Sequence, residues 1–491
     1  MNSLVKTLLV WAALAPVVMA DMPRSIEIRM LNPLRTTHPS ADGSRIRAVL
    51  IKPFTEDGEI LMPAGTIVHG NVRHSRRVGF GIRHERASIE LDFDECQLPD
   101  GERVAIEARL SRIDNAREQV DRNGKIRGIL AASNPLGIAR GMWYWPDPRF
   151  LFMAPGGLTG GAGTAWAKLA LGPIGAAGLF GARLLLTTFP DPEIDLPAGA
   201  EITLLVHPFT SLKSWGSVPP APELASSLAQ FLSGKPVQIA KADGTVVADL
   251  INLAFVGPKS ILVESFVTGG WVEAEPLTRK SFAKSYSAFT QRQGYPTAPV
   301  SKLFYETRLP DLVFEKSLNS IAKRHHIRLW NAGTFEGEDI WLGAATHDVT
   351  VTFNRSTFGL SHRVAANLDR EREKVITDLG FVNASASTAY LPRAIVPLAG
   401  VQSDGSLAVL RLQTPSAQDQ WDVQDLVRPS NMHRLSRRMV LETRQYLFRE
   451  NPYYLGYRAV RGLAAKKRLA GRDATTFGRD NSVCFGLNTS C

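Results

Sequence analysis

Alternation of apolar and polar side chains is the clearest pattern in the first part of the chain. Residues 89–94 alternate Ile, Leu and Phe with acidic residues, the two-residue period of a strand with one buried face. A similar alternation follows the turn signal at residues 99–101, and residues 45–51 give another strand candidate. The pattern predicts a mostly β domain, a barrel or a sandwich, over residues 21–215.

A short turn phrase occurs twice in this part of the chain. Pro-Ala-Gly at residues 63–65 precedes one strand-like run, and Pro-Ala-Gly at residues 197–199 precedes another. Proline fixes one backbone angle and glycine permits a positive φ, so each phrase can form a tight turn into a strand. Because the phrase recurs, we expect the residues before 150 and after 190 to share one β domain that an insertion interrupts.

The insertion, residues 150–186, is apolar and rich in glycine, and its charged side chains are Lys168 and Arg183. On the turn-then-strand phrase, residues 45–209 resemble the periplasmic β domain of the TrbI family of conjugation and type IV secretion channel proteins. A helical hairpin inserted in that domain reaches the outer membrane, so the resemblance implies a membrane-inserting hairpin here. A glycine-rich buried or flexible connector is the alternative, because glycine and proline weaken a helix.

The second half of the chain mixes helical and strand patterns. A proline-rich stretch within residues 216–235 predicts a stiff linker followed by a short helix. Beyond it, residues 327–330 and 340–344 are typical of paired strands, and residues 349–353 of a third. Apolar spacing over residues 367–379 indicates an amphipathic helix. We therefore expect this half to be α+β, and the whole chain to be an α+β multidomain protein.

Two runs within residues 236–415 carry a family resemblance. Residues 324–330 read Arg-His-His-Ile-Arg-Leu-Trp, and residues 340–348 read Ile-Trp-Leu-Gly-Ala-Ala-Thr-His-Asp. With the residues around them, these runs are similar to the LssY C-terminal domain over nearly its whole length. No activity is established for that family. In some members the domain is joined to membrane-embedded segments related to phosphatidic acid phosphatases, which implies work near lipid.

Histidine is concentrated in the same region. The candidate catalytic residues there are His325, His326, His347, Asp348, His362 and Asp369. The candidate ligands of a divalent metal are His326, His347, His362 and Asp348. Because His325 and His326 are neighbours on one predicted strand, they must point to opposite faces, and only one of them can belong to a given site. General acid and base chemistry around a phosphate is a second use of these groups, and purely structural histidines are a third interpretation.

The N-terminus has the features of a signal peptide. Lys6 precedes a short apolar run over residues 7–18, and Val18 and Ala20 are small residues at the positions that a signal peptidase reads. We expect residues 1–20 to be removed and the protein to be exported to the periplasm, either free there or associated with the outer membrane. An uncleaved N-terminal anchor is the alternative.

The last segment, residues 416–491, is basic and expected to be helical. Between Arg428 and Arg472 there are twelve Lys or Arg side chains and two Glu, interleaved with tyrosine and phenylalanine. This combination favours an interfacial helix on anionic lipid. The candidate membrane contacts are Lys466, Lys467 and Arg468. Nucleic acid fits the charge equally well, but an exported protein seldom meets it. A tail that packs on its own domain is the alternative.

Two classes of function follow from these patterns. The favoured one is a non-catalytic interaction or assembly module at or near the membrane, with the membrane surface or envelope proteins as partners. The alternative is a metal- or histidine-dependent hydrolase of a lipid or envelope phosphoester. The sequence has no nucleophile elbow, phosphate-binding loop or zinc-protease helix. The hydrolase therefore requires His347, Asp348 and His362 to converge in one accessible cleft.

Overall fold

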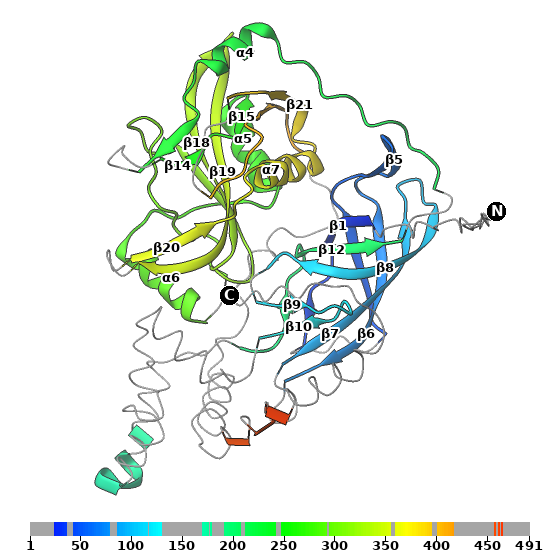
Figure 1. The fold of residues 1–491 in the computed structure, drawn as a ribbon, viewed down its shortest axis with the longest axis vertical. Helices are drawn as coiled ribbons and strands as arrows, with labels where there is room; N and C mark the ends of the chain where they lie inside the picture. The colour runs from blue at the N-terminus through cyan, green and yellow to red at the C-terminus, as the bar shows by residue number, and fades with distance from the viewer. Residues whose placement is uncertain are drawn as a thin grey trace, which may run out of the picture.

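The computed structural model contains two bodies of regular structure that lie side by side (Figure 1). It describes residues 24–36, 43–78, 86–115, 117–129, 191–207, 212–241, 247–291, 294–354, 359–394 and 400–416, with short helical pieces at 169–175, 177–178, 456–457, 460–461 and 463–464. The predicted signal peptide, most of the apolar insertion, and the basic side chains Lys466, Lys467 and Arg468 lie outside the described residues.

Six antiparallel strands close into a barrel in the N-terminal part. They are β1 (Arg24–Met30), β3 (Arg45–Leu50), β6 (Ile67–Arg76), β7 (Ser88–Gln97), β8 (Arg103–Ile113) and β12 (Glu201–Val206). Their order is β6-β3-β1-β12-β8-β7, and β7 pairs back with β6. Closure leaves these strands without an open edge between β6 and β7. The prediction of a mostly β N-terminal part is confirmed, and this part is a barrel.

Both turn phrases form the predicted turns into strands. Gly65 and Gly199 have φ values of 91° and 85°, in the left-handed region that favours glycine. The amide of Gly65 donates to the carbonyl of Leu50 at 2.8 Å, and that of Gly199 to the carbonyl of Met30 at 2.6 Å, so each turn is tied to the end of a neighbouring strand. Because β12 pairs with both β1 and β8, the residues on either side of the insertion build one barrel, as expected.

The barrel encloses a single apolar core. Its buried side chains include Ile28, Ile46, Val68, Phe93 and Leu204. The acidic neighbours Asp92 and Asp94 are exposed, which matches the alternation in the sequence. Three pairs of short strands are attached to the barrel: β2 (Leu34–Arg35) with β11 (Asp195–Leu196), β4 (Phe54–Glu56) with β5 (Glu59–Met62), and β9 (Gln119–Val120) with β10 (Ile126–Arg127).

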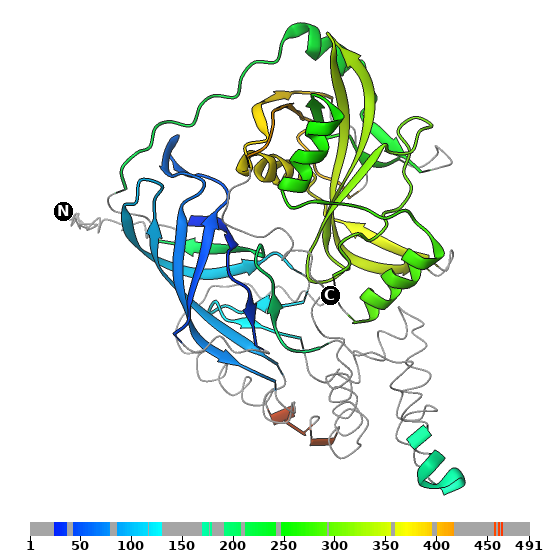
Figure 2. The same ribbon diagram turned by 180° about the vertical axis from the view of Figure 1, so that it is seen from behind.

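A mostly exposed linker, residues 212–225, leads from the barrel to helix α4 (Ser226–Ser233). Figure 2 shows it as a long, irregular green segment outside both bodies. It is tied to the hairpin of β4 and β5, because Trp215 donates its amide to the carbonyl of Ile60 and Ile60 donates to Gly216, both at 2.8 Å. The short helix predicted after the proline-rich stretch is confirmed.

The C-terminal unit, residues 236–416, is built on a second sheet. Its strands are β15 (Leu253–Val256), β16 (Val272–Glu273), β17 (Leu312–Ser317), β18 (Arg324–Phe335), β19 (Glu338–Asn354), β20 (Gly359–Val364), β21 (Ser385–Leu391) and β22 (Leu407–Leu412). Their order is β16-β17-β18-β19-β15-β22-β21, and β20 pairs with β19 off this path. β15 and β22 are parallel, whereas the other described pairings of this sheet are antiparallel.

Helices and a strand pair cover the two faces of this sheet. Helices α5 (Lys259–Thr268) and α7 (Asp369–Phe381) pack on one face, around Phe255, Phe266 and Trp271. Helix α4 packs on the other face, around Trp330 and Leu342, beside the pair β13 (Gln238–Ala240) and β14 (Val247–Leu250). Helix α6 (Arg279–Gln291) lies near β20 (Figure 1). The unit therefore combines a sheet with helices, and α7 is the amphipathic helix expected from the sequence.

The predicted pair of strands at residues 327–330 and 340–344 is confirmed by β18 and β19. Residues 349–353 are not a separate strand, because β19 continues through them and pairs there with β20. Within this long strand the buried Asp348 pairs with Arg324 of β18 at 2.9 Å. Among the described residues, no helix combines the length and apolar character needed to cross a membrane.

The barrel and the C-terminal unit share an apolar cluster. Val49 and Ile51, at the end of β3, are buried in the same cluster as Val375 and Leu379 of α7 and Trp271. Apolar burial at this contact removes water from the polar groups around it. Each of those groups must then find a partner within the protein.

Candidate functional site

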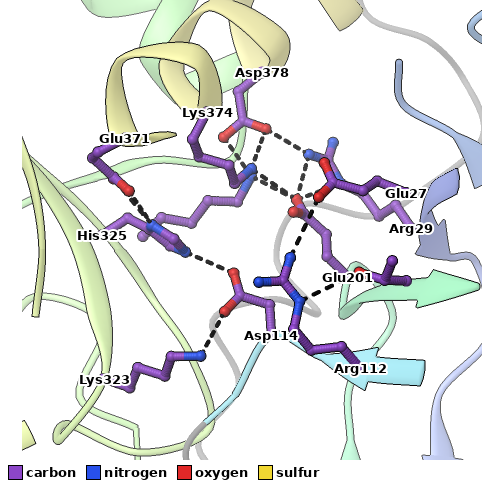
Figure 3. Close-up of polar contacts among 12 residues, drawn as sticks. Glu27, Arg29, Arg112, Asp114, Glu201, Lys323, His325, Glu371, Lys374 and Asp378 are labelled. Atoms are coloured by element: carbon purple, nitrogen blue, oxygen red, sulfur yellow. Dashed lines mark hydrogen bonds and ion pairs between the residues drawn. The ribbon is translucent and has the colours of Figure 1, made fainter. Parts of the chain in front are cut away.

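A buried network of charges joins the barrel to helix α7. Arg29 of β1 contacts Glu201 of β12 at 2.7 Å and Asp378 of α7 at 2.8 Å. Lys374 of α7 and Lys316 of β17 each contact the same two carboxylates (Figure 3). Arg29 and Asp378 have fully buried side chains, so this network lies inside the contact. It ties together strands and a helix that are far apart in the sequence.

The network holds three cations and two carboxylates. Burial alone would raise the pKa of Glu201, but Lys374, Lys316 and Arg29 hold that pKa well below its usual range. Burial, together with the neighbouring charge of Arg29, lowers the pKa of Lys316 to about 8. Asp378 also accepts a hydrogen bond from the Trp271 indole at 3.0 Å. Both carboxylates therefore have cationic partners. Of the three cations, Lys316 is the one whose charged form the surroundings disfavour.

Beside this network a cleft of about 940 Å³ opens between the two bodies. Its walls come from β1, the loop after β3 and the ends of β8 and β12 on the barrel side, and from β18, β19 and α7 on the other side. Charged residues of both signs line it: Arg24, Glu27, Lys52, Arg112, Asp114, Lys323, Asp369, Arg370 and Glu373. Both units build this cleft, and its lining includes His325 and His347.

His325 bridges the two units at this cleft. Its Nε2 lies 2.8 Å from Asp114, which follows β8 of the barrel, and its Nδ1 lies 2.8 Å from Glu371 of α7 (Figure 3). Burial alone would lower the pKa of His325, but Glu371 and Asp114 outweigh it and raise this pKa to about 10. Lys323 contacts the other oxygen of Asp114 at 3.0 Å. The ring is thus a charged bridge between two carboxylates from different parts of the chain.

His347 lies directly against His325. The two residues face one another across β18 and β19, and their rings stack with centroids 4.3 Å apart. Burial and the charge of His325 lower the pKa of His347 to about 3, so its ring is neutral. Its Nε2 is buried and has no hydrogen-bond partner among the described residues. A nitrogen of a neutral imidazole carries either a lone pair or a proton. Since Nε2 of His347 uses neither within the described residues, it is free to bind another group.

These side chains form a set that could hold a metal ion. Asp114, His325 and His347 each place one ligand atom so that all three atoms lie within 4.8 Å of one another. Two imidazoles and a carboxylate are the donors that zinc and similar divalent ions take. Glu371 contacts the ring nitrogen of His325 that faces away from Asp114, as carboxylates behind metal-bound histidines do.

The other face of the same strands holds a second polar cluster. Strand alternation turns Arg324, His326 and Asp348 away from His325. Asp348 lies 3.1 Å from His362 Nδ1 and 3.7 Å from His326 Nδ1. His326 Nε2 contacts the hydroxyl of Thr346 at 2.7 Å. Burial lowers the pKa of His326 well below its usual range, so this histidine is a neutral core residue.

The structure divides the residues singled out in the sequence between these two faces. His326, Asp348 and His362 are together on one face, and His325 and His347 are together on the other. The opposite faces of His325 and His326 were predicted. His347 does not meet Asp348 and His362 in one cleft, so the convergence required for a catalytic centre of those three residues is not present in the described structure.

Asp369 has another role. Its carboxylate accepts hydrogen bonds from the Ser403 hydroxyl at 2.8 Å and the Asp404 amide at 2.7 Å. It also contacts Arg372 at 3.3 Å. Asp369 therefore holds the turn before β22 against the start of α7, and it lines the cleft at its rim.

Asp114 and Glu371 were not predicted from the sequence as partners of the histidines. Asp114 and His325 are separated by 211 positions, and only the packing of the barrel on the C-terminal unit brings them together. Glu371 lies on α7, among helical residues that carry charges of both signs. Asp114 lies beyond the alternating residues 104–108 and directly after β8, where loop side chains gather at the end of a barrel.

Comparison with known proteins identifies the second body. Residues 235–407 match the family model of the LssY C-terminus, so this region is an LssY C-terminal domain, as the sequence resemblance indicated. No curated protein matches the chain. The family match begins after the barrel, and the resemblance of residues 45–209 to the TrbI β domain remains a prediction.

Proposed function

Starting from a chain that joins an LssY C-terminal domain to a six-stranded barrel, we propose that it is an exported cell-envelope protein that acts as a non-catalytic interaction or assembly module at or near the membrane. One observation carries the proposal. Two groups of buried charges, Arg29 with Glu201 and Asp378, and His325 with Asp114, join the two bodies to each other. They give a single body that presents one cleft with charges of both signs.

A rigid two-part body with a charged cleft suits recognition of a polar partner. Charged groups around such a surface fix orientation and partner choice more than they add affinity. The partner that fits the expected location is an envelope protein or the headgroup layer of the membrane. The signal peptide predicted at residues 1–20 supplies the route to that location.

Position-specific crosslinking tests the module. A photoreactive residue replaces Thr55 or Arg370, which are exposed on opposite walls of the cleft, in cells that make the full chain. A matched control replaces the exposed Lys280 on α6, which is outside the cleft. We expect the same envelope component to be captured from both cleft positions and not from position 280. Equal capture from all three positions, or none, would contradict recognition through the cleft.

Export has its own measurement. The mass of the mature protein from the envelope fraction should correspond to a chain that begins at Asp21. A protein that retains Met1, or that is found in the cytoplasm, would contradict the proposed location while leaving the cleft experiment valid.

The hydrolase expected from the sequence loses its original support, because His347 does not meet Asp348 and His362 in one cleft. A metal- or histidine-dependent hydrolase of a phosphoester built on a different set of residues is the second candidate. The placement of His325, His347 and Asp114 on an open cleft favours it, since hydrolytic metal sites combine few protein ligands with an accessible position. Hydrolysis of a chromogenic phosphomonoester and phosphodiester by the purified chain, with zinc added, distinguishes the two. If the wild type hydrolyses the substrate and His347→Phe does not, the result supports the hydrolase. If the wild type hydrolyses it no faster than His347→Phe, the result supports the module.

A further inference from the structure

We propose that Asp114, His325 and His347 bind one divalent transition-metal ion, with zinc as the ion to test, and that this ion bridges the barrel and the LssY C-terminal domain. The site keeps His347 from the ligand set expected from the sequence, but Asp114 and His325 take the places of His326, His362 and Asp348. It is independent of the proposed function, since metal binding is measured without a partner or a substrate.

The ligand atoms already lie close to the required separation. Donors that each bind zinc at ~2.1 Å are at most ~4.2 Å from one another. The three atoms here lie within 4.8 Å of one another, and the shortest gap, from His325 Nε2 to Asp114, is 2.8 Å. Tetrahedral zinc ligands lie ~3.4 Å from one another, so an ion requires side-chain rotations that widen the gap between His325 and Asp114 and bring all three donor atoms to that spacing.

His347 gives the site an independent signature. Its Nε2 is buried and has no hydrogen-bond partner in the described part of the chain, although the ring packs on His325. Buried polar atoms nearly always have a partner, and one without a partner calls for an explanation such as an ion. An ion at the shared edge of the two rings, near the plane of each, would use this nitrogen as a ligand.

The surrounding residues hold the ligands in place. Glu371 contacts Nδ1 of His325 at 2.8 Å, which orients the ring and leaves Nε2 toward Asp114. Lys323 contacts one oxygen of Asp114 at 3.0 Å and leaves the other directed to His325. In the metal-free protein a proton on Nε2 joins His325 to Asp114. Metal binding displaces that proton to solvent, while the proton between Nδ1 and Glu371 stays.

The ligands come from both bodies, which gives the ion a structural consequence. Asp114 belongs to the barrel, and His325 and His347 belong to the C-terminal unit. An ion held by all three stabilises the contact between the bodies. Because the site lines the cleft, a fourth position of the ion faces a space that water or a ligand can enter.

Metal uptake by the purified, tag-free full chain tests the site. After removal of metal with a chelator, the protein is titrated with zinc chloride, and bound zinc is measured after dialysis. We expect about one zinc ion per chain and a higher thermal unfolding temperature with zinc. His347→Phe keeps an aromatic ring against His325 but removes the nitrogen, and Asp114→Asn keeps the shape but removes the charge. Each should weaken zinc binding at least tenfold.

Two further variants separate direct from indirect effects. Glu371→Gln should weaken zinc binding by about 10–100-fold, the range for a carboxylate that supports a ligating histidine. Glu373→Gln changes a carboxylate that lines the same cleft outside the ligand set and should bind zinc as the wild type does. Zinc uptake that is the same in His347→Phe, Asp114→Asn and the wild type would overturn the proposal.

If a variant does not fold, metal binding by the wild-type chain alone still tests the proposal. Cobalt bound by two imidazoles and a carboxylate gives visible absorption bands, and zinc that competes for the same site removes them. A folded wild-type chain that takes up no zinc and shows no cobalt bands would overturn the proposal.

Discussion

Asp378 is the residue on which the contact between the two bodies depends most. It is fully buried and accepts contacts from Arg29, Lys316, Lys374 and the Trp271 indole. Removing it leaves three buried cations with Glu201 as their remaining carboxylate. Breaking a buried ion pair by removing one partner costs about 3–5 kcal/mol. We therefore expect Asp378→Ala to lower the free energy of unfolding in urea by about that amount.

Glu338 provides the matched control. It contacts Arg411 at 2.6 Å, but both side chains are more than 40% exposed. Exposed ion pairs contribute about 0–1 kcal/mol, so Glu338→Ala should change the unfolding free energy by less than 1 kcal/mol. Equal losses in the two variants would contradict the role assigned to burial in the network.

Lys316 makes stability depend on pH in the alkaline range. Its pKa is about 8 in the folded protein, compared with ~10.4 in an unfolded chain. Between these values the folded state binds fewer protons, so the free energy of unfolding rises with pH there. Below pH 8 the charged Lys316 destabilises the fold by about 3 kcal/mol, at ~1.36 kcal/mol per unit of pKa.

Substitution of Lys316 by methionine isolates this effect. Lys316→Met keeps the length of the side chain and leaves two cations for two carboxylates. Relative to this variant, the wild type should gain stability as the pH rises from 8 to 10, by urea unfolding at each pH. Two stability curves that stay parallel over this range would show that Lys316 is not destabilised by its surroundings.

The effect on stability of replacing glycine by alanine depends on the element that contains the glycine, as Gly70 and Gly380 show. A Cβ on Gly70, in β6, would lie 2.4 Å from the Asp92 carbonyl oxygen of β7, whereas a Cβ on Gly380, in α7, meets nothing within 4 Å. Gly70→Ala should destabilise the barrel by about 1–3 kcal/mol, the range for overpacking. Gly380→Ala should stabilise the protein by about 0.5–1 kcal/mol, because alanine favours a helix. Thermal unfolding measures both, and shifts in the same direction would contradict this account.

The elements were largely predictable because their patterns are local. The alternation around Phe93 and the turn phrases at Gly65 and Gly199 predicted strands that the barrel contains. The prediction failed where a charge is buried by a partner that the sequence does not reveal. Residues 349–353 are predicted as a separate strand, yet β19 runs from Glu338 to Asn354, and Arg324 on the neighbouring strand pairs with the buried Asp348 inside it.

The candidate site was predictable only in part, for the same reason. The histidine concentration was visible, and strand alternation correctly separated His325 from His326. The partner Asp114 could not be predicted, because Asp114 and His325 are far apart in the sequence and no repeating pattern of residues links them. Which of the two faces meets another body depends on how the barrel packs, and that packing is set by apolar residues such as Val49 and Ile51.

At the scale of the whole molecule, the basic tail gives a prediction outside the described residues. Attraction to anionic lipid contributes about 1 kcal/mol per Lys or Arg near the surface. The Debye length falls to ~3 Å at 1 M salt, which screens most of this attraction. We expect the full chain to bind anionic vesicles at low salt and to lose much of that binding at 1 M salt.

Substitution of Lys466, Lys467 and Arg468 by glutamine should weaken the binding further in vesicle sedimentation. Neutral vesicles serve as the control, since insertion of the apolar segment 150–186 would not depend on lipid charge and would survive high salt. Equal binding to neutral and anionic vesicles would contradict the electrostatic interpretation of the tail.

The pairing of β1 with β12 also determines when the molecule can fold. Strand β1 pairs with the nearby β3 on one side, but on its other side Arg24 pairs with Val206, so that side of β1 has its partner only after the whole insertion has been synthesised. Contacts between such distant segments make folding slow, because the loop must close before the contact contributes. The buried network and the His325 bridge need residues still further along. The barrel therefore cannot close before residue 206 has been synthesised.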